Sequence, residues 1–256
     1  MKKVFFYIFI ILLSAVLVVS AGIAAKTYLD YKKADDVYED MQNRFVETNT
    51  EATNPEAPTE ETQNPDEKET VPITIDFDTL LSENADVVGW IYCPDTPINY
   101  PVVQAEDNSK YLRRDLNGNY LVSGTVFVDY RNGPIVEDAN YILYGHNMKD
   151  GSMFSSLAKY KQQSYYDEHP VLYFLTPTSD YKIELYAGLV VKRDAVVYSP
   201  NPDETAFAEF LESAKANSTF QSDLTIGAND TLITLSTCSY EYDNARYIIL
   251  GILNSN

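Results

Sequence analysis

Cysteine and histidine are scarce in this sequence, with two of each among 256 residues. Two cysteines allow at most one disulfide, so the chain is not a small scaffold held together by disulfides. The Cys and His positions also lack the spacing of a zinc site, and we expect neither a metal nor another cofactor. Catalysis by a thiol or an imidazole therefore has very few candidate residues.

Basic residues are also few. The sequence has 19 Lys and Arg against 38 Asp and Glu, which gives a formal net charge of −19. A surface this acidic argues against nucleic acid or anionic lipid as the main partner, because both carry negative charge.

One long apolar run stands out, at residues 4–25, and Lys2 and Lys3 precede it. At about 1.5 Å per helical residue, it is long enough to cross a hydrocarbon core of about 30 Å. A cleaved secretory signal is the alternative, with small residues at 21–25 as its cleavage site, although its apolar region is usually shorter. We expect residues 1–26 to form a cytoplasmic tip and a single-pass membrane anchor, with the folded part outside the cell.

The rest of the chain divides into a spacer and a folded part. Residues 27–45 are polar but compatible with a helix, whereas residues 47–70 are rich in Glu, Thr, Asn and Pro. The second composition cannot bury enough apolar surface to order itself, so we expect an acidic, disordered linker there. Residues 71–256 are long enough to form one domain with its own core.

Short β-type runs separated by turn signals dominate the folded part. We expect strands at residues 87–92, 99–104, 121–129, 141–144, 171–176 and 181–192 and in a final hairpin at 231–250. The strands do not alternate regularly with helices, so the pattern indicates a barrel or a sandwich. Helices are expected at residues 76–84, 152–160 and 201–217, the last with Asn201 as its N-cap.

The final hairpin carries the first candidate site. Cys238 closes its first strand and Arg246 opens its second, with a short polar turn between them. Facing residues of an antiparallel pair lie about 5 Å apart, so the thiol and the guanidinium should meet at one edge of the sheet. A nearby cation favours the thiolate, which attacks carbonyl carbon. The structural alternative is a small apolar cysteine at a strand end beside a solvated arginine.

The remaining candidates are His146, His169 and Cys93. His146 follows an apolar strand and a glycine, a place from which a side chain projects into a cleft. His169 lies in a polar segment, and we expect it on the surface. We expect Cys93 to be a buried free thiol, but a Cys93–Cys238 disulfide stays open as an alternative and would remove the nucleophile.

Several segments resemble one protein family. TLSTC at 234–238, followed by Arg246, is similar to the TLxTC…R signature of sortases, the membrane-anchored cysteine transpeptidases of Gram-positive bacteria. INYPVVQ at 98–104, SGTVFVDYRN at 123–132 and YGHNMKDGSMF at 144–154 resemble class B sortases in particular. The resemblance spans about residues 87–253, nearly the whole folded part.

This resemblance implies an eight-stranded sortase-type β-barrel with added helices. It also implies an active site of Cys238, His146 and Arg246, in which the thiolate attacks the threonine carbonyl of a sorting motif. A thioester acyl-enzyme forms, and an amine then resolves it. His146 would transfer protons, and Arg246 would stabilise the oxyanion because its guanidinium stays protonated.

The resemblance also implies the partners. The substrates would be surface proteins with an NPxTN-like or variant motif, and the acceptor would be a peptidoglycan peptide amine or lipid II. Asn99, Ser236 and Thr237 would lie near the substrate groove. Asp243 or Asn244 could orient His146, although the family pattern does not require such a residue.

Two other functions stay open on these residues. A membrane-anchored cysteine hydrolase would use the same side chains and let water resolve the thioester. A non-catalytic surface module would keep the barrel only as a scaffold. For an enzyme, ordinary pKa values of about 8.5 for cysteine and about 6.5 for histidine predict a bell-shaped pH profile with its top between them.

Overall fold

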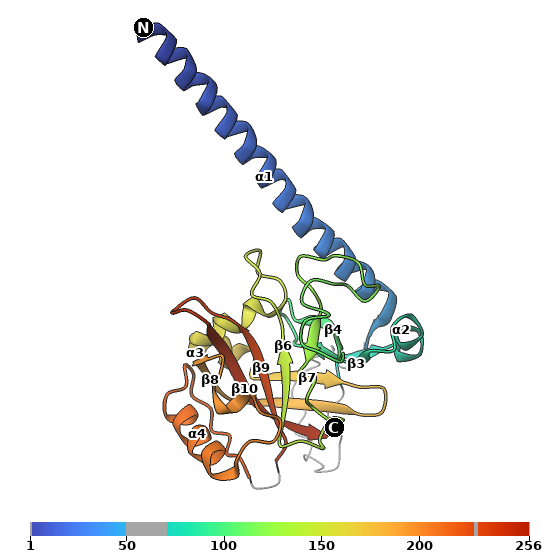
Figure 1. The fold of residues 1–256 in the computed structure, drawn as a ribbon. Helices are drawn as coiled ribbons and strands as arrows, with labels where there is room; N and C mark the ends of the chain where they lie inside the picture. Colours follow the sequence, from blue (N-terminus) through green and yellow to red (C-terminus); the bar gives the residue numbers. More distant parts are fainter. Residues whose placement is uncertain (1, 50–70, 228–229, 256) are drawn as a thin grey trace, which may run out of the picture.

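The structure is a computed structural model that describes residues 2–49, 71–227 and 230–255 (Figure 1). The elements are, in chain order, α1 (Lys2–Phe45), β1 (Val46–Thr48), β2 (Ile73–Ile75), α2 (Phe77–Glu83), β3 (Val87–Tyr92), β4 (Asn99–Val103), β5 (Val126–Val128), β6 (Asn140–Tyr144), the 3-10 helix η2 (Phe154–Lys161), α3 (Gln163–Glu168), β7 (Val171–Leu175), β8 (Asp180–Lys192), the 3-10 helix η3 (Val196–Tyr198), α4 (Glu204–Ala216), β9 (Leu232–Cys238) and β10 (Ala245–Ser255).

Eight strands close into a barrel in the order β10-β8-β7-β3-β4-β5-β6-β9. The expected barrel is therefore confirmed, and the sandwich is excluded. Most neighbouring strands are antiparallel, but β4 pairs with β5 and β6 pairs with β9 in parallel. The strand expected at 121–129 is shorter than predicted, because only Val126–Val128 pair as β5. Gly124 turns the chain just before it, with φ +59, where a Cβ would lie 2.5 Å from the Tyr111 carbonyl oxygen.

Alternate residues of β10 pack on opposite faces of the barrel wall. Tyr247 and Ile249 belong to the barrel core, whereas Ile248 and Leu250 belong to a second buried cluster that includes Phe207 of α4. A strand that is buried on both faces has a continuous apolar sequence instead of an alternating one. The wall that carries the end of β9 and the start of β10 is therefore held from both sides.

Helix α4 covers this second cluster and begins later than the sequence suggested. Its N-cap is Asp203, whose carboxylate accepts a hydrogen bond from the Ala206 amide at 3.0 Å. Asn201 instead accepts from the Ala139 amide at 3.2 Å and donates to Asp138. The prediction of Asn201 as the cap was wrong, because Asp203 offers an equally good capping oxygen closer to the buried stripe.

Helix α1 continues through the boundary expected at residue 26 (Figure 1). Its first part is exposed, and the helix is long and apolar enough to cross a membrane. Its last turns pack on the barrel, where Ala34, Tyr38, Met41 and Phe45 are buried. Their spacing of three or four residues places them on one helix face. The C-terminal part of α1 is thus joined to the barrel by a packed interface.

Hydrogen bonds hold this end of α1 in place. The Tyr38 hydroxyl donates to the Gly124 carbonyl, and Gln42 Nε2 donates to the Asn99 carbonyl at 2.9 Å. Strand β1 then pairs with β2 in antiparallel register. The start of the expected linker is therefore part of the fold up to residue 49, and residues 50–70 of that linker lie outside the described residues.

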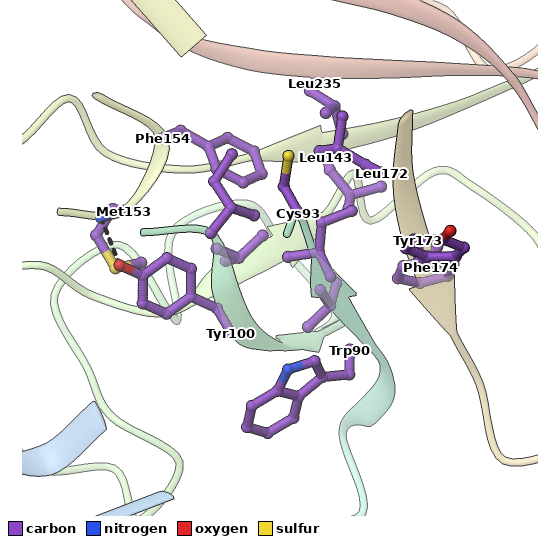
Figure 2. Close-up of a cluster of buried hydrophobic side chains, with 14 of the residues drawn as sticks. Trp90, Cys93, Tyr100, Leu143, Met153, Phe154, Leu172, Tyr173, Phe174 and Leu235 are labelled. Carbon is purple, nitrogen blue, oxygen red and sulfur yellow. Dashed lines mark hydrogen bonds between the residues drawn. The ribbon is translucent and has the colours of Figure 1, made fainter. Parts of the chain in front are cut away.

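The barrel core contains large aromatic side chains around β3 and β4 (Figure 2). Trp90 and Phe174 are completely buried, and Cys93 lies among them with its sulfur toward Phe154 and Leu143. The Tyr100 hydroxyl accepts a hydrogen bond from the Met153 amide at 2.9 Å. This bond ties the start of η2, and with it the loop that follows β6, to the core.

Candidate active site

The hairpin of β9 and β10 places Cys238 directly opposite Arg246. Ser239 closes the turn by donating its amide hydrogen to the Ala245 carbonyl at 3.0 Å. Asn244 adopts φ 62, a left-handed conformation that asparagine tolerates better than most residues. The pairing predicted from the sequence is confirmed, and both side chains start from the same edge of the barrel.

His146 reaches the same edge from β6. Strand β6 runs parallel to β9, and Tyr144 pairs with Ser236. His146 follows Tyr144 along the chain just as Cys238 follows Ser236. Because the two strands are parallel, both residues lie at the same end of the barrel. Asn147 Nδ2 donates to the Cys238 carbonyl at 2.7 Å and connects the two segments.

Gly145 is required where this loop leaves β6. Its amide donates to the Ser236 carbonyl at 3.1 Å, and a Cβ there would lie 2.5 Å from the ring of Phe154. The Phe154 amide in turn donates to the His146 carbonyl at 3.0 Å. Any side chain at position 145 would therefore collide with Phe154, whose amide holds the His146 carbonyl.

Cys238, His146 and Arg246 line one pocket of about 460 Å³. The other lining residues are Asn108, Leu112, Phe127, Tyr144, Gly145, Arg193, Tyr198, Ser236 and Thr237. Among the described residues, two arginines and no carboxylate line this pocket, although the whole chain has a net charge of −19. Such a pocket suits a substrate whose carbonyl oxygen gains negative charge during the reaction.

Burial sets the protonation state of His146. Burial first, and then the positive charge of Arg113, lowers the pKa of His146 to about 4, against a small opposing effect of a backbone hydrogen bond with Ser123. The imidazole is therefore neutral at neutral pH and can accept a proton. Cys238 is a free, half-buried thiol in the same pocket. One pocket thus contains a thiol, an imidazole that can accept a proton and a guanidinium that can stabilise an oxyanion.

The three predicted substrate contacts lie in different surroundings. Ser236 lines the pocket, and its hydroxyl is 2.8 Å from the Tyr198 hydroxyl. Thr237 also lines the pocket, and its buried hydroxyl has no hydrogen-bond partner among the described residues. The structure does not bring Asn99 into this lining, because its side-chain oxygen accepts from the Trp90 indole at 2.7 Å.

The other candidates lie away from the pocket. Cys93 is completely buried, and burial raises its thiol pKa. Cys93 and Cys238 are both free, so the alternative of a disulfide between them is not realised. His169 follows α3, where its ring packs against Tyr165. In the described part of the chain, no group of His, Cys, Asp and Glu side chains is arranged to hold a metal ion.

A buried carboxylate behind the pocket wall is not among the residues predicted from the sequence. Asp129 is fully buried and pairs with Arg131 through two hydrogen bonds of 2.8 and 2.7 Å. It also accepts from the Tyr144 hydroxyl at 2.9 Å and from Asn108 Nδ2 at 3.1 Å, and both donors line the pocket. Arg131 donates to the Tyr198 carbonyl at 2.7 Å. The sequence signal was the segment 123–132, which contributed only to the family resemblance.

Comparisons with known proteins agree on one family. A family model described as the sortase domain matches residues 91–254. Sortase B of Listeria monocytogenes is 37% identical over 177 residues, which cover 68% of this chain and 72% of the relative. Sortase B of Bacillus anthracis matches in structure with a TM-score of 0.70 and 32% identity, over 90% of this chain and 100% of that one.

Two further solved structures match as well, one of Staphylococcus aureus sortase B in complex with substrate and one of a sortase B in complex with triglycine. Both have a TM-score of 0.65 and 30% identity, and both cover 70% of this chain. The match covers 84% of the chain in the substrate complex and 85% of the chain in the triglycine complex.

Proposed function

Because the chain belongs to the sortase family and within it to sortase B, we propose that it cleaves a sorting motif of secreted proteins after a threonine and transfers them to a cell-wall amine. The enzyme class is that of the family, a cysteine transpeptidase. The observation that carries the proposal is the convergence of Cys238, His146 and Arg246 on one pocket.

The first half of the reaction forms a thioester. His146 takes the proton of the Cys238 thiol, and the sulfur attacks the carbonyl carbon of the threonine. The carbonyl oxygen becomes an oxyanion, which the planar donors of Arg246 stabilise. When the peptide C–N bond breaks, His146 gives its proton to the departing amine.

The second half reverses these steps with a new amine. The acceptor amine attacks the thioester carbon, and neutral His146 takes the proton that the amine loses. A C–N bond forms, the C–S bond breaks, and Cys238 leaves as a thiolate that regains the proton from His146. Without an acceptor, water can resolve the same thioester, so hydrolysis is the competing reaction.

The relatives support the choice of partners. S. aureus sortase B has been solved with a substrate, and a sortase B has been solved with triglycine, which supports a peptide substrate and an amine acceptor for this chain. We propose an NPxTN-like or variant motif and an amine of a peptidoglycan peptide or of lipid II. Ser236 and Thr237 are proposed to contact the motif because they line the pocket. Asn99 stays a prediction for substrate contact.

Helix α1 supports a proposal for the cellular location. We propose that residues 4–25 anchor the chain in the membrane and that the barrel lies outside the cell, where surface proteins and cell-wall precursors are found. Detergent should then be needed to extract the chain from membranes. On intact protoplasts, an added protease should be able to cleave the chain at Lys26 and beyond. A mature N-terminus near Ala25 in the culture medium would instead indicate a cleaved signal.

A peptide-library cleavage screen tests the substrate proposal. The fragment 27–256 is mixed with peptides that vary around an NPxTN core, and the fragments are identified by mass spectrometry. We expect cleavage after threonine in a narrow set of sequences. Cleavage at unrelated positions in many peptides would indicate a general protease instead.

A further inference from the structure

A second pocket adjoins the active-site pocket, in the loop between β4 and β5. Its volume is about 440 Å³, and its lining includes Lys110, Arg113 and Arg114 together with the exposed side chains of Leu112 and Tyr120. Among the described residues, no carboxylate lines it. Leu112 lines the active-site pocket as well, so the two pockets share a wall. We call this second pocket the basic loop pocket.

Each arginine of the basic loop pocket donates a hydrogen bond to a carbonyl of its own loop. Arg113 Nη1 donates to the Val122 carbonyl, and Arg114 Nη1 donates to the Gly118 carbonyl at 3.2 Å. In the part of the chain that the structure describes, neither guanidinium forms an ion pair. Each arginine therefore keeps donors for a ligand, because a guanidinium has five N–H groups.

Two acidic side chains at this loop, Asp86 and Asp107, already have hydrogen-bond partners. Asp86 accepts from Lys110 and from the Tyr111 hydroxyl. Asp107 accepts from the backbone amides of Ser109 and Lys110, at 2.7 and 2.9 Å. These carboxylates hold the loop together, and neither of them forms an ion pair with Arg113 or Arg114.

Helix α1 places this pocket close to the membrane. Lys33 Nζ donates to the Tyr120 carbonyl at 2.9 Å, and Figure 1 shows the loop after β4 beside α1, on the side of the barrel from which the helix leaves. Lys33 lies about 12 Å along the helix from Ala25, the end of the apolar run, at about 1.5 Å per residue. The headgroup layer is about 5–8 Å deep. Long basic side chains and an exposed tyrosine at this level can reach the headgroups.

We propose that the basic loop pocket binds the phosphate of an anionic phospholipid headgroup and so holds the active-site end of the barrel on the membrane surface. The planar donors of Arg113 and Arg114 match a phosphate, and Tyr120 suits the interface. The inference rests on the proposed membrane placement of α1. The acidic composition of the whole chain argued against anionic lipid as the main partner. The basic loop pocket is a local exception, because its charged lining residues are all basic.

A headgroup in the basic loop pocket would also affect the active site. Because Leu112 belongs to both pockets, a headgroup that orders this loop also orders one wall of the substrate pocket. The barrel would then work at a fixed height above the membrane, on substrates that are themselves close to the membrane.

Hydrogen exchange of the full chain in nanodiscs tests this proposal. One set of discs contains phosphatidylcholine only, and the other contains about one third phosphatidylglycerol. We expect amide exchange across residues 109–122 to slow by about tenfold or more in the anionic discs. In Arg113→Gln/Arg114→Gln the slowing should fall below about twofold, because each basic residue near an anionic surface contributes about fivefold to binding. Salt at about 1 M should also remove it, since charges are then screened within about 3 Å.

A matched variant controls for charge. Lys159→Gln/Lys182→Gln removes the same number of charges outside the pocket and should keep the slowing of the wild type. Exchange of β9 and β10 reports whether each variant is folded. If the double arginine variant loses that protection, Arg114→Gln alone replaces it, with an expected loss of about fivefold in the slowing.

Three outcomes would overturn the proposal in different ways. A chain that washes out of the discs contradicts the membrane placement itself and with it this inference. A retained chain that exchanges equally in both lipids contradicts only the pocket assignment. Equal protection by inorganic pyrophosphate in phosphatidylcholine discs would assign the pocket to a free phosphate instead of a lipid headgroup.

Discussion

His146 should make the folded chain less stable when the pH falls from 7 to 5. Burial, and then Arg113, lowers the pKa of this imidazole to about 4 in the folded state. In the unfolded chain the value returns to about 6.5. Between these two values the unfolded chain binds more protons than the folded chain. The stability that is fully present above pH 6.5 is therefore lost as the pH falls toward 4.

The expected size follows from the two pKa values. The linkage relation gives a loss of about 2 kcal/mol in the free energy of unfolding between pH 7 and pH 5. Urea unfolding of the fragment 27–256 can be followed by the fluorescence of Trp90, which is fully buried and is the single tryptophan of the chain. The substitution His146→Asn should remove this part of the pH dependence, because asparagine does not titrate. The control His169→Asn should keep it.

Parallel pH curves for wild type and His146→Asn would refute this reasoning. The same shift also changes the kinetic expectation. The bell expected from ordinary pKa values has its acid limb at about 6.5, but burial of His146 moves this limb of kcat/KM to about pH 4. The neutral pair of thiol and imidazole then persists over a wider pH range, and a flat profile through pH 6 no longer argues against the site.

The remaining predictions concern single side chains and the end of α1. Cys238→Ala should abolish acyl-enzyme formation in a mass spectrum, whereas Cys93→Ala should stay active and lose about 1–2 kcal/mol in urea unfolding; a folded but inactive Cys93 variant would reverse these roles. Arg246→Lys should lower turnover by about 10²–10³, since the forked donors are lost, and a near-normal rate would reduce Arg246 to a distant charge. A fragment that begins at Val71 should be less stable than 27–256 by about 5 kcal/mol or more, because it lacks buried side chains such as Phe45; equal urea midpoints would show that the α1 interface contributes little.

The sequence predicted those parts of the site that are formed by residues close together along the chain. The pairing of Cys238 with Arg246 follows from two β-type runs joined by a short turn. The position of His146 beside them depends on the parallel pairing of β6 with β9, which are far apart in the sequence. No periodicity in the chain specifies that contact, and only the family resemblance suggested it.

Other features required the packed structure. The helical spacing of Tyr38 and Phe45 was visible, but the surface that buries them is formed by distant parts of the chain. The hydrogen bonds of Asp129 to Tyr144 and Asn108 join three segments that no short motif connects. The pKa of His146 depends on burial, which a strand-end position in the sequence does not reveal.

Mass spectrometry of a single reaction tests transpeptidation by Cys238 most directly. The fragment 27–256 is mixed with a peptide selected in the library screen, with and without a triglycine amine. We predict a thioester on Cys238 that accumulates without amine, and a new peptide bond to triglycine when the amine is present. The account would be contradicted by cleavage that proceeds without a Cys238 adduct. A product that is always the free acid, whatever amine is supplied, would instead identify a hydrolase.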